Sequence, residues 1–161
     1  MENYENPLPC RIRFAHVDEW DEAMYLVWKT FLIYEAPVYS PEGVRSFGNF
    51  ITDSTLKRMF ELGEYRMLVA IYENEIAGMI TLRDKNHISL LFVDEKYHFL
   101  GVGRSLVSRL CRYLRDEAGF RHLTVNASPY SVGFYHRIGF RDTGPEALSD
   151  GISYTPMEIR F

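Results

Sequence analysis

The sequence predicts an α+β fold of the mixed α/β kind, in which a mostly antiparallel sheet with one β-α-β unit carries helices on both faces. Three strand-like runs follow one another at 65–72, 76–82 and 88–93, which predicts an antiparallel meander. A loop, an amphipathic helix and another strand come next, and this order is typical of a β-α-β unit. The 161 residues suit a single domain spanning 1–161.

The chain opens with a short strand and a long helix. Residues 11–16 alternate between polar and apolar side chains, and Asp18 then provides an N-cap. Pro37 breaks the helix after about four turns, and we expect one or two short helices with loops between Ile33 and Leu62. The apolar residues at helical spacing are Trp20, Ala23, Met24, Val27, Trp28 and Phe31.

Turn residues divide the meander and the second half of the chain. Asn74 tolerates a left-handed conformation between the first two strands, and residues 84–86 form the next turn. A helix starts at Gly101-Val102-Gly103 and stops at Gly119. The remaining expected elements are a strand at 123–127, a short helix at 131–138 and a last strand at 152–161.

Composition excludes several classes of protein. The net charge of 18 minus 22, or −4, argues against a nucleic-acid partner and suits either a cationic substrate or mere solubility. The two cysteines, Cys10 and Cys111, form no CxxC pair and no zinc-ligand spacing, which indicates a reducing, cytoplasmic setting and no metal. No apolar run is long enough to span a membrane.

The strongest local signal is a glycine pair at a helix start. The segment His98-Phe99-Leu100-Gly101-Val102-Gly103-Arg104 follows an apolar strand and opens the predicted helix. Helix N-termini present free N–H groups and partial positive charge, and glycines let a phosphate approach them. The Rossmann pattern fails because Leu106 replaces its third glycine, and the P-loop lysine is absent. The segment therefore predicts a pyrophosphate site of another kind.

Two segments together resemble the GNAT superfamily of N-acetyltransferases. The run from Val93 through His98 to Gly101 and Gly103 resembles the acetyl-CoA motif of that family, with His98 standing where Arg or Gln is usual. The run from Asn126 through Tyr135 to Gly139-Phe140 resembles the family's second signature. The order of the expected elements is also similar, so the resemblance covers nearly the whole chain.

The resemblance implies acetyl-CoA as the acetyl donor. In similar proteins the strand before the loop splays from the next strand, and the pantetheine arm lies between them against the backbone. The residues implied for this role are Leu91, Phe92 and Val93, with Asn126 and Ser128 on the second strand. The pyrophosphate would meet the N–H groups of His98, Phe99, Leu100, Gly101, Val102, Gly103 and Arg104.

The resemblance also implies a catalytic tyrosine. Tyr135 matches the family's general acid, which protonates the leaving thiolate, and a group with an ordinary pKa near 10 keeps its proton until sulfur carries charge. A general base for the amine is left open among four residues. These are Glu35, Asp84, His87 and Ser89.

Three functions stay open at this point. The first is N-acetyl transfer to a primary amine of a small molecule or peptide. The second is a non-catalytic acyl-CoA-binding or sensing module of the same fold, and the third is a structural protein without cofactor. The acceptor would be chosen by residues 33–62 and 142–154, and relatives also imply a homodimer.

Overall fold

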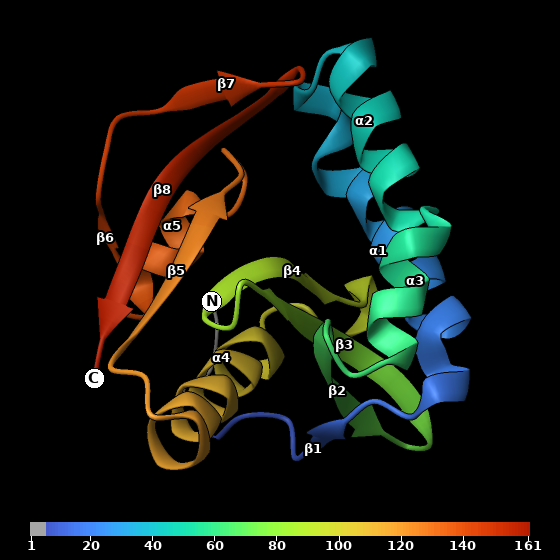
Figure 1. Cartoon of the computed structure of the whole chain (residues 1–161), viewed down its shortest axis with the longest axis vertical. Helices are drawn as coiled ribbons and strands as arrows, with labels where there is room; N and C mark the ends of the chain where they lie inside the picture. Colours follow the sequence, from blue (N-terminus) through green and yellow to red (C-terminus); the bar gives the residue numbers. More distant parts are fainter. Residues whose placement is uncertain (1–5) are drawn as a thin grey trace.

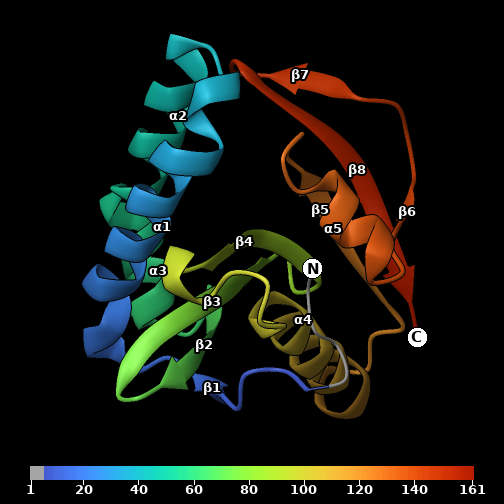
Figure 2. The same cartoon turned by 180° about the vertical axis from the view of Figure 1, so that it is seen from behind.

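The computed structural model describes residues 6–161 and forms one eight-stranded sheet with helices on both faces (Figures 1 and 2). The strand order is β1-β2-β3-β4-β5-β8-β6, and β7 pairs with β8. The strands are β1 (Arg11–Phe14), β2 (Arg66–Tyr72), β3 (Glu75–Arg83), β4 (His87–Val93), β5 (His122–Ala127), β6 (Arg141–Asp142), β7 (Ala147–Ser149) and β8 (Ile152–Arg160). The helices are α1 (Trp20–Tyr34), α2 (Pro41–Ile51), α3 (Ser54–Glu61), α4 (Val102–Tyr113) and α5 (Val132–Arg137).

The predicted fold class is confirmed. Strands β1 to β4 pair antiparallel in chain order, and β4 pairs parallel with β5 across the helix α4. Asn74 and Asp84 adopt the left-handed backbone conformation, with φ of 63° and 50°, that the two tight turns require. Gly119, with φ of 76°, caps the π-helical turn Leu114–Ala118 that continues α4.

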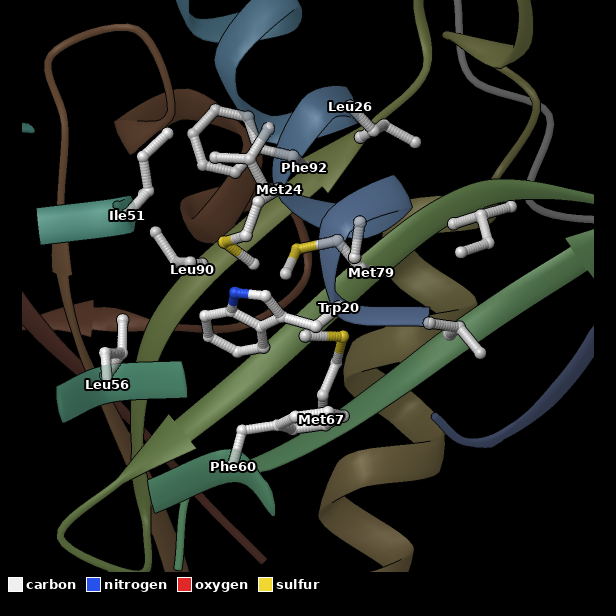
Figure 3. Close-up of a cluster of buried hydrophobic side chains, with 14 of the residues drawn as sticks. Trp20, Met24, Leu26, Ile51, Leu56, Phe60, Met67, Met79, Leu90 and Phe92 are labelled. Atoms are coloured by element: carbon white, nitrogen blue, oxygen red, sulfur yellow. The ribbon is translucent and has the colours of Figure 1, made fainter. Parts of the chain in front are cut away.

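Each face of the sheet has its own hydrophobic core. On one face α1, α2 and α3 cover the meander, and Figure 3 shows Trp20 of α1 surrounded by methionine and phenylalanine side chains. The ring of Trp20 lies 4.9 Å from that of Phe60. On the other face α4 and α5 pack through residues that include Leu106, Leu110 and Tyr135. Helices α1 and α2 therefore contact side chains from the first face of the sheet, and α4 and α5 contact those from the other face.

The prediction that Asp18 caps the first helix is wrong. Asp18 lies inside a 3-10 turn, Val17–Glu19, that runs directly into α1. The cap residue of this turn is His16, and the Glu19 carboxylate accepts its backbone N–H at 2.6 Å. The carboxylate three residues after the cap position thus satisfies the free N–H group, as in a capping box.

The expected irregular region from Ile33 to Leu62 contains two helices, α2 and α3. Ser40 caps α2 by accepting the Gly43 N–H at 3.1 Å, and Asp53 caps α3 by accepting the Thr55 N–H at 2.7 Å. Both are ordinary N-cap residues, so the local sequence explains where each helix begins.

The start of α2 is fastened to the turn between β7 and β8 (Figure 1). Ser40 donates its hydroxyl to the Gly151 carbonyl at 3.3 Å, and Ser46 donates to the Asp150 carbonyl at 3.1 Å. Gly43 and Gly151 touch backbone to backbone, and a Cβ on Gly151 would lie 2.6 Å from the Gly43 nitrogen. We call this contact the glycine clasp; it joins the helices to the C-terminal strands.

A methyl group at Gly43 is expected to break the clasp. Its Cβ would overlap the Gly151 carbonyl, which is backbone and cannot rotate away. We expect Gly43→Ala to lower the free energy of unfolding by about 1–3 kcal/mol, as overpacking does. Gly48→Ala in the same helix is the control, because its Cβ would meet the Trp28 ring at an ordinary 3.4 Å. Urea denaturation should show Gly48→Ala stabilised by about 0.5–1 kcal/mol, and equal effects of the two variants would contradict the clasp.

Candidate active site

The site begins where two neighbouring strands part. The parallel pairing of β4 with β5 consists of two residue pairs, His87 with Thr124 and Ile88 with Val125. Beyond them β5 follows β8 away from the meander (Figure 1). The splay that the family resemblance implies is therefore present.

A bulge in β4 lies at the same point. Opposite β3, Leu90 pairs with Thr81 and Ile88 pairs with Leu82, so Ser89 is the extra residue. A β-bulge bends its strand and increases the local twist, which turns the end of β4 away from β5.

Three hydroxyl groups, of which those of Tyr65 and Thr81 are buried, support this bulge. Tyr65 donates to Ser89 at 2.8 Å and lies 2.7 Å from the Thr81 hydroxyl, which accepts the Leu90 N–H at 3.0 Å. Because Tyr65 spends its proton on Ser89, Thr81 must donate to Tyr65. These linked hydroxyl groups thus provide a hydrogen-bond acceptor for the Leu90 N–H beside the bulge. Ser89, one of the four base candidates, is thus held in a structural network.

A cavity of about 860 Å³ fills the space between the parted strands. It extends from the loop after β4 to α1, α2 and the β7–β8 turn. Most of the predicted site residues line it. They are Leu91, Phe92, Val93, His98, Phe99, Val102, Gly103, Asn126, Ser128 and Tyr135.

Three predicted cofactor residues lie outside this lining. Gly101 and Arg104 line a separate cleft of about 390 Å³ between α4 and the segment before β1. Leu100 lines neither cavity, and its carbonyl accepts the Leu8 N–H at 2.9 Å. The helix start thus borders both cavities, with Val102 and Gly103 on the main one and Gly101 and Arg104 on the smaller one.

The loop after β4 is shaped for the helix start that follows it. Gly101 has φ of 79°, which glycine adopts without cost, and Val102 and Gly103 begin α4 with N–H groups that have no acceptor inside the helix. Gly103 also lets α5 approach, because a Cβ there would lie 3.2 Å from the Phe134 ring. Lys29 of α1 fixes the loop from the other side through a 2.9 Å ion pair with the buried Asp94.

His98 already makes a hydrogen bond within the loop. Its Nε2 lies 2.7 Å from the Val93 carbonyl oxygen, and since a carbonyl only accepts, the ring donates. Its ring lies 4.8 Å from that of Tyr34, which in turn lies 5.3 Å from Tyr130. These three rings connect α1, the glycine loop and the loop after β5 beside the cavity.

Tyr135 is buried at the wall of the cavity. Its ring lies 5.2 Å from Phe134 and 5.0 Å from Phe140. Burial raises the pKa of Tyr135 above its ordinary value, and the charge of Glu35 raises it further. The hydroxyl therefore remains a proton donor at neutral pH.

Glu35 lies in a polar cluster that joins α1 to the end of β5. Burial raises the pKa of Glu35, while hydrogen bonds from Ser128 and Tyr39 act in the opposite direction. Burial and the Glu35 charge also raise the pKa of Tyr39. Tyr39 was not predicted, because nothing local marks a tyrosine in a loop as a partner of a distant carboxylate.

The geometry separates the four base candidates. Asp84 sits in the turn before β4 and is not part of the cavity lining. Burial and the charge of Arg83 lower the pKa of His87 to about 4. Ser89 is committed to the bulge. Glu35 is the candidate that lines the cavity as a carboxyl, and its charge raises the pKa of Tyr135.

Thr30 of α1 adds a further polar group to the cavity wall. It is 5 % exposed, and its hydroxyl oxygen has no hydrogen-bond partner among residues 6–161. A buried hydroxyl without a partner costs free energy unless a ligand or water meets it. Thr30 therefore supports the view that the cavity receives a polar ligand.

The acidic excess of the chain is not concentrated in the cavity. The carboxylates and guanidinium groups of its lining balance two to two, as Glu35 and Asp150 against Arg83 and Arg137. The net charge of −4 thus says little about the acceptor.

Residues 6–161 contain no group of three or more His, Cys, Asp or Glu side chains arranged to hold a metal ion. In the same residues, no helix has both the length and the apolar character needed to cross a membrane.

Comparison with known proteins identifies the family of this chain. Residues 35–161 match the family model of the acetyltransferase (GNAT) domain. The peptidyl-lysine N-acetyltransferase YjaB of Escherichia coli is 29 % identical over 104 residues, which are 62 % of this chain and 67 % of that protein. The alignments with the curated relatives thus span about two thirds of their length.

Solved structures share the fold. A GCN5-related N-acetyltransferase from Rhodopseudomonas palustris superposes with a TM-score of 0.83 at 20 % identity, over 99 % of this chain and 100 % of the other. The PaiA N-acetyltransferase of Thermoplasma acidophilum, solved in complex with coenzyme A, gives 0.77 at 16 % identity over 96 % and 100 %.

Proposed function

The chain belongs to the GNAT acetyltransferase family, and from this premise we propose that it transfers the acetyl group of acetyl-CoA to a primary amine of a small molecule or peptide. The observation that carries the proposal is that a carboxyl, Glu35, and a buried phenol, Tyr135, both line the cavity between β4 and β5. One group accepts a proton and the other donates one, which are the two proton transfers that amide formation needs.

The residues present fit acetyl-CoA, which would supply an activated acetyl group as a thioester. The parted backbone of β4 from Leu91 to Val93 lines the cavity and would bind the pantetheine arm. The helix start at Gly101 to Gly103 would bind the pyrophosphate through N–H groups. Asn126 on β5 and the unpartnered Thr30 hydroxyl offer further hydrogen bonds.

The chemistry we propose links the two proton-transfer residues. Glu35 takes a proton from the amine as it attacks, and Tyr135 donates its proton to the sulfur that leaves. The charge of Glu35 raises the pKa of Tyr135 at rest. Once Glu35 has accepted a proton that charge is gone, so Tyr135 becomes more acidic when the thiolate forms. This coupling favours proton uptake by Glu35 first and proton donation by Tyr135 second.

Calorimetric titration with acetyl-CoA tests the donor site. We expect wild-type binding, and at least a tenfold weaker affinity in Gly101→Glu, because a carboxylate at the helix start repels phosphate. Gly63→Glu is the matched control, since Gly63 has the same φ of 79° and open space around it. It bears the same backbone strain away from the cavity and should bind normally. No binding by the wild type would end the proposal.

Transfer is then measured with a panel of primary amines. Acetyl-CoA binding without transfer to any of them would favour the alternative, a non-catalytic acyl-CoA-binding module. We further propose that residues 1–161 form one domain. We also propose a cytoplasmic setting, because Cys10 and Cys111 are free thiols. The homodimer remains a prediction that light scattering tests.

A further inference from the structure

An arginine lines the cavity beside the start of β4, at the opposite end of that strand from the glycine loop. Arg83 ends β3 and pairs with His87 at the start of β4. Both side chains line the cavity, on the sheet face that α1 and α2 cover. Neither residue is used by the chemistry proposed above.

His87 holds this arginine by a defined hydrogen bond. An Arg83 guanidinium nitrogen lies 3.3 Å from His87 Nε2, and His87 Nδ1 lies 2.7 Å from the Thr124 hydroxyl. Because arginine only donates, Nε2 accepts and Nδ1 must carry the hydrogen. The neutral ring therefore fixes the guanidinium against β5 without neutralising its charge.

No carboxylate within residues 6–161 forms an ion pair with Arg83, whereas several other basic side chains of the fold are paired. Lys29, Arg13 and Arg141 are paired at 2.9, 2.8 and 2.9 Å. Arg83 thus presents its remaining N–H donors at the cavity wall as a site for an anion, and its planar fork matches a carboxylate.

The separation of this arginine from Glu35 can be gauged from the positions of their partners along β5 and the residue after it. Glu35 is hydrogen-bonded to Ser128. Arg83 is hydrogen-bonded to His87, which is hydrogen-bonded to Thr124, four residues before Ser128 along the extended chain. Four residues of extended chain span about 13 Å, which sets the scale of the separation between the two groups. The same lining includes the apolar side chains Phe47, Phe50 and Leu90.

We propose that the acceptor carries a carboxylate separated from its amine by an extended apolar body, and that Arg83, positioned by His87, binds this carboxylate. The inference rests on the proposed function, because it takes Glu35 as the place of the amine. It excludes an α-amino acid as the preferred acceptor, since its two charges lie on adjacent atoms of one short segment.

Three amines with one common body test the proposal. 2-Phenylethylamine has no carboxylate, 4-(2-aminoethyl)benzoate has a remote one, and phenylalanine has an adjacent one. We expect the remote carboxylate to give the highest kcat/KM. Arg83→Gln should raise the KM of that compound by about tenfold or more, the cost of one bidentate pair, and leave 2-phenylethylamine within about twofold.

Lys85→Gln is the control, because it removes the same charge from the adjacent turn and Lys85 is not part of the cavity lining. His87→Gln should raise the KM of the remote carboxylate and leave kcat unchanged. Equal use of all three amines, or their equal loss in Arg83→Gln, overturns the inference and leaves the proposed function standing.

If none of the three amines is acetylated, the wider amine panel decides the proposed function, and binding decides the inference. Calorimetry with 4-(2-aminoethyl)benzoate and 2-phenylethylamine, in the presence of coenzyme A, should then still show tighter binding of the carboxylate. That preference should vanish in Arg83→Gln, and its persistence there would overturn the inference.

Discussion

Tyr135→Phe is expected to lower turnover by tenfold or more while the affinity for acetyl-CoA changes little. The substitution removes one oxygen from a ring that Phe134 and Phe140 continue to hold, so the cavity wall keeps its shape. What is lost is the proton donor for the leaving sulfur, and general acids contribute about 10²- to 10⁴-fold. Steady-state kinetics and calorimetry on the same preparation measure both quantities.

Tyr113→Phe on α4 is the control for this experiment. Its ring packs on Phe14, on the face of the sheet away from α1, and it is not part of the cavity lining. We expect wild-type turnover and binding from it. Turnover within about twofold of the wild type in Tyr135→Phe would remove Tyr135 from the mechanism.

The parts of this fold that could be predicted from sequence depend on local patterns. The meander followed from strand-like runs separated by Asn74 and by residues 84–86, because a period of two and a left-handed turn are written in neighbouring residues. The helix start at Gly101 followed for the same reason. The splay of β4 from β5 came from the family resemblance, since a bulge at Ser89 has no local signature.

The parts that could not be predicted depend on residues distant in sequence. The glycine clasp brings Gly43 to Gly151, and neither glycine stands in a pattern that names its partner. The hydrogen bond between Glu35 and Ser128 crosses from the end of α1 to the end of β5. The sequence placed Glu35 among four candidates for a base, and tertiary packing was needed to separate it from Asp84 and His87.

Glu35→Gln is expected to lower kcat/KM by about 100-fold at neutral pH, because an amide cannot accept the proton of the amine. Glutamine keeps the size of the side chain and an oxygen that accepts hydrogen bonds from Ser128 and Tyr39. The affinity for acetyl-CoA should therefore be preserved. Glu42→Gln, in the first turn of α2 and outside the cavity lining, is the matched control.

The pH profile distinguishes a base from a structural role. Burial raises the pKa of Glu35, so the wild-type rate should fall with decreasing pH at a value above the ordinary 4.5 of a glutamate. This limb should disappear in Glu35→Gln. A variant that keeps the limb would show that another group takes the proton.

Stability should move in the direction opposite to activity. A carboxyl whose pKa is raised on folding binds its proton more tightly in the folded chain, so the free energy of unfolding falls as pH rises from 4.5 through the raised value. Above that window the wild type bears the full cost of a charged Glu35, and Glu35→Gln does not. The less active variant should therefore melt no lower than the wild type at neutral pH, which a loss of folding could not produce.

The double variant Glu35→Gln, Tyr135→Phe should lose less turnover than the product of the two single effects, because the two proton transfers are coupled through one charge.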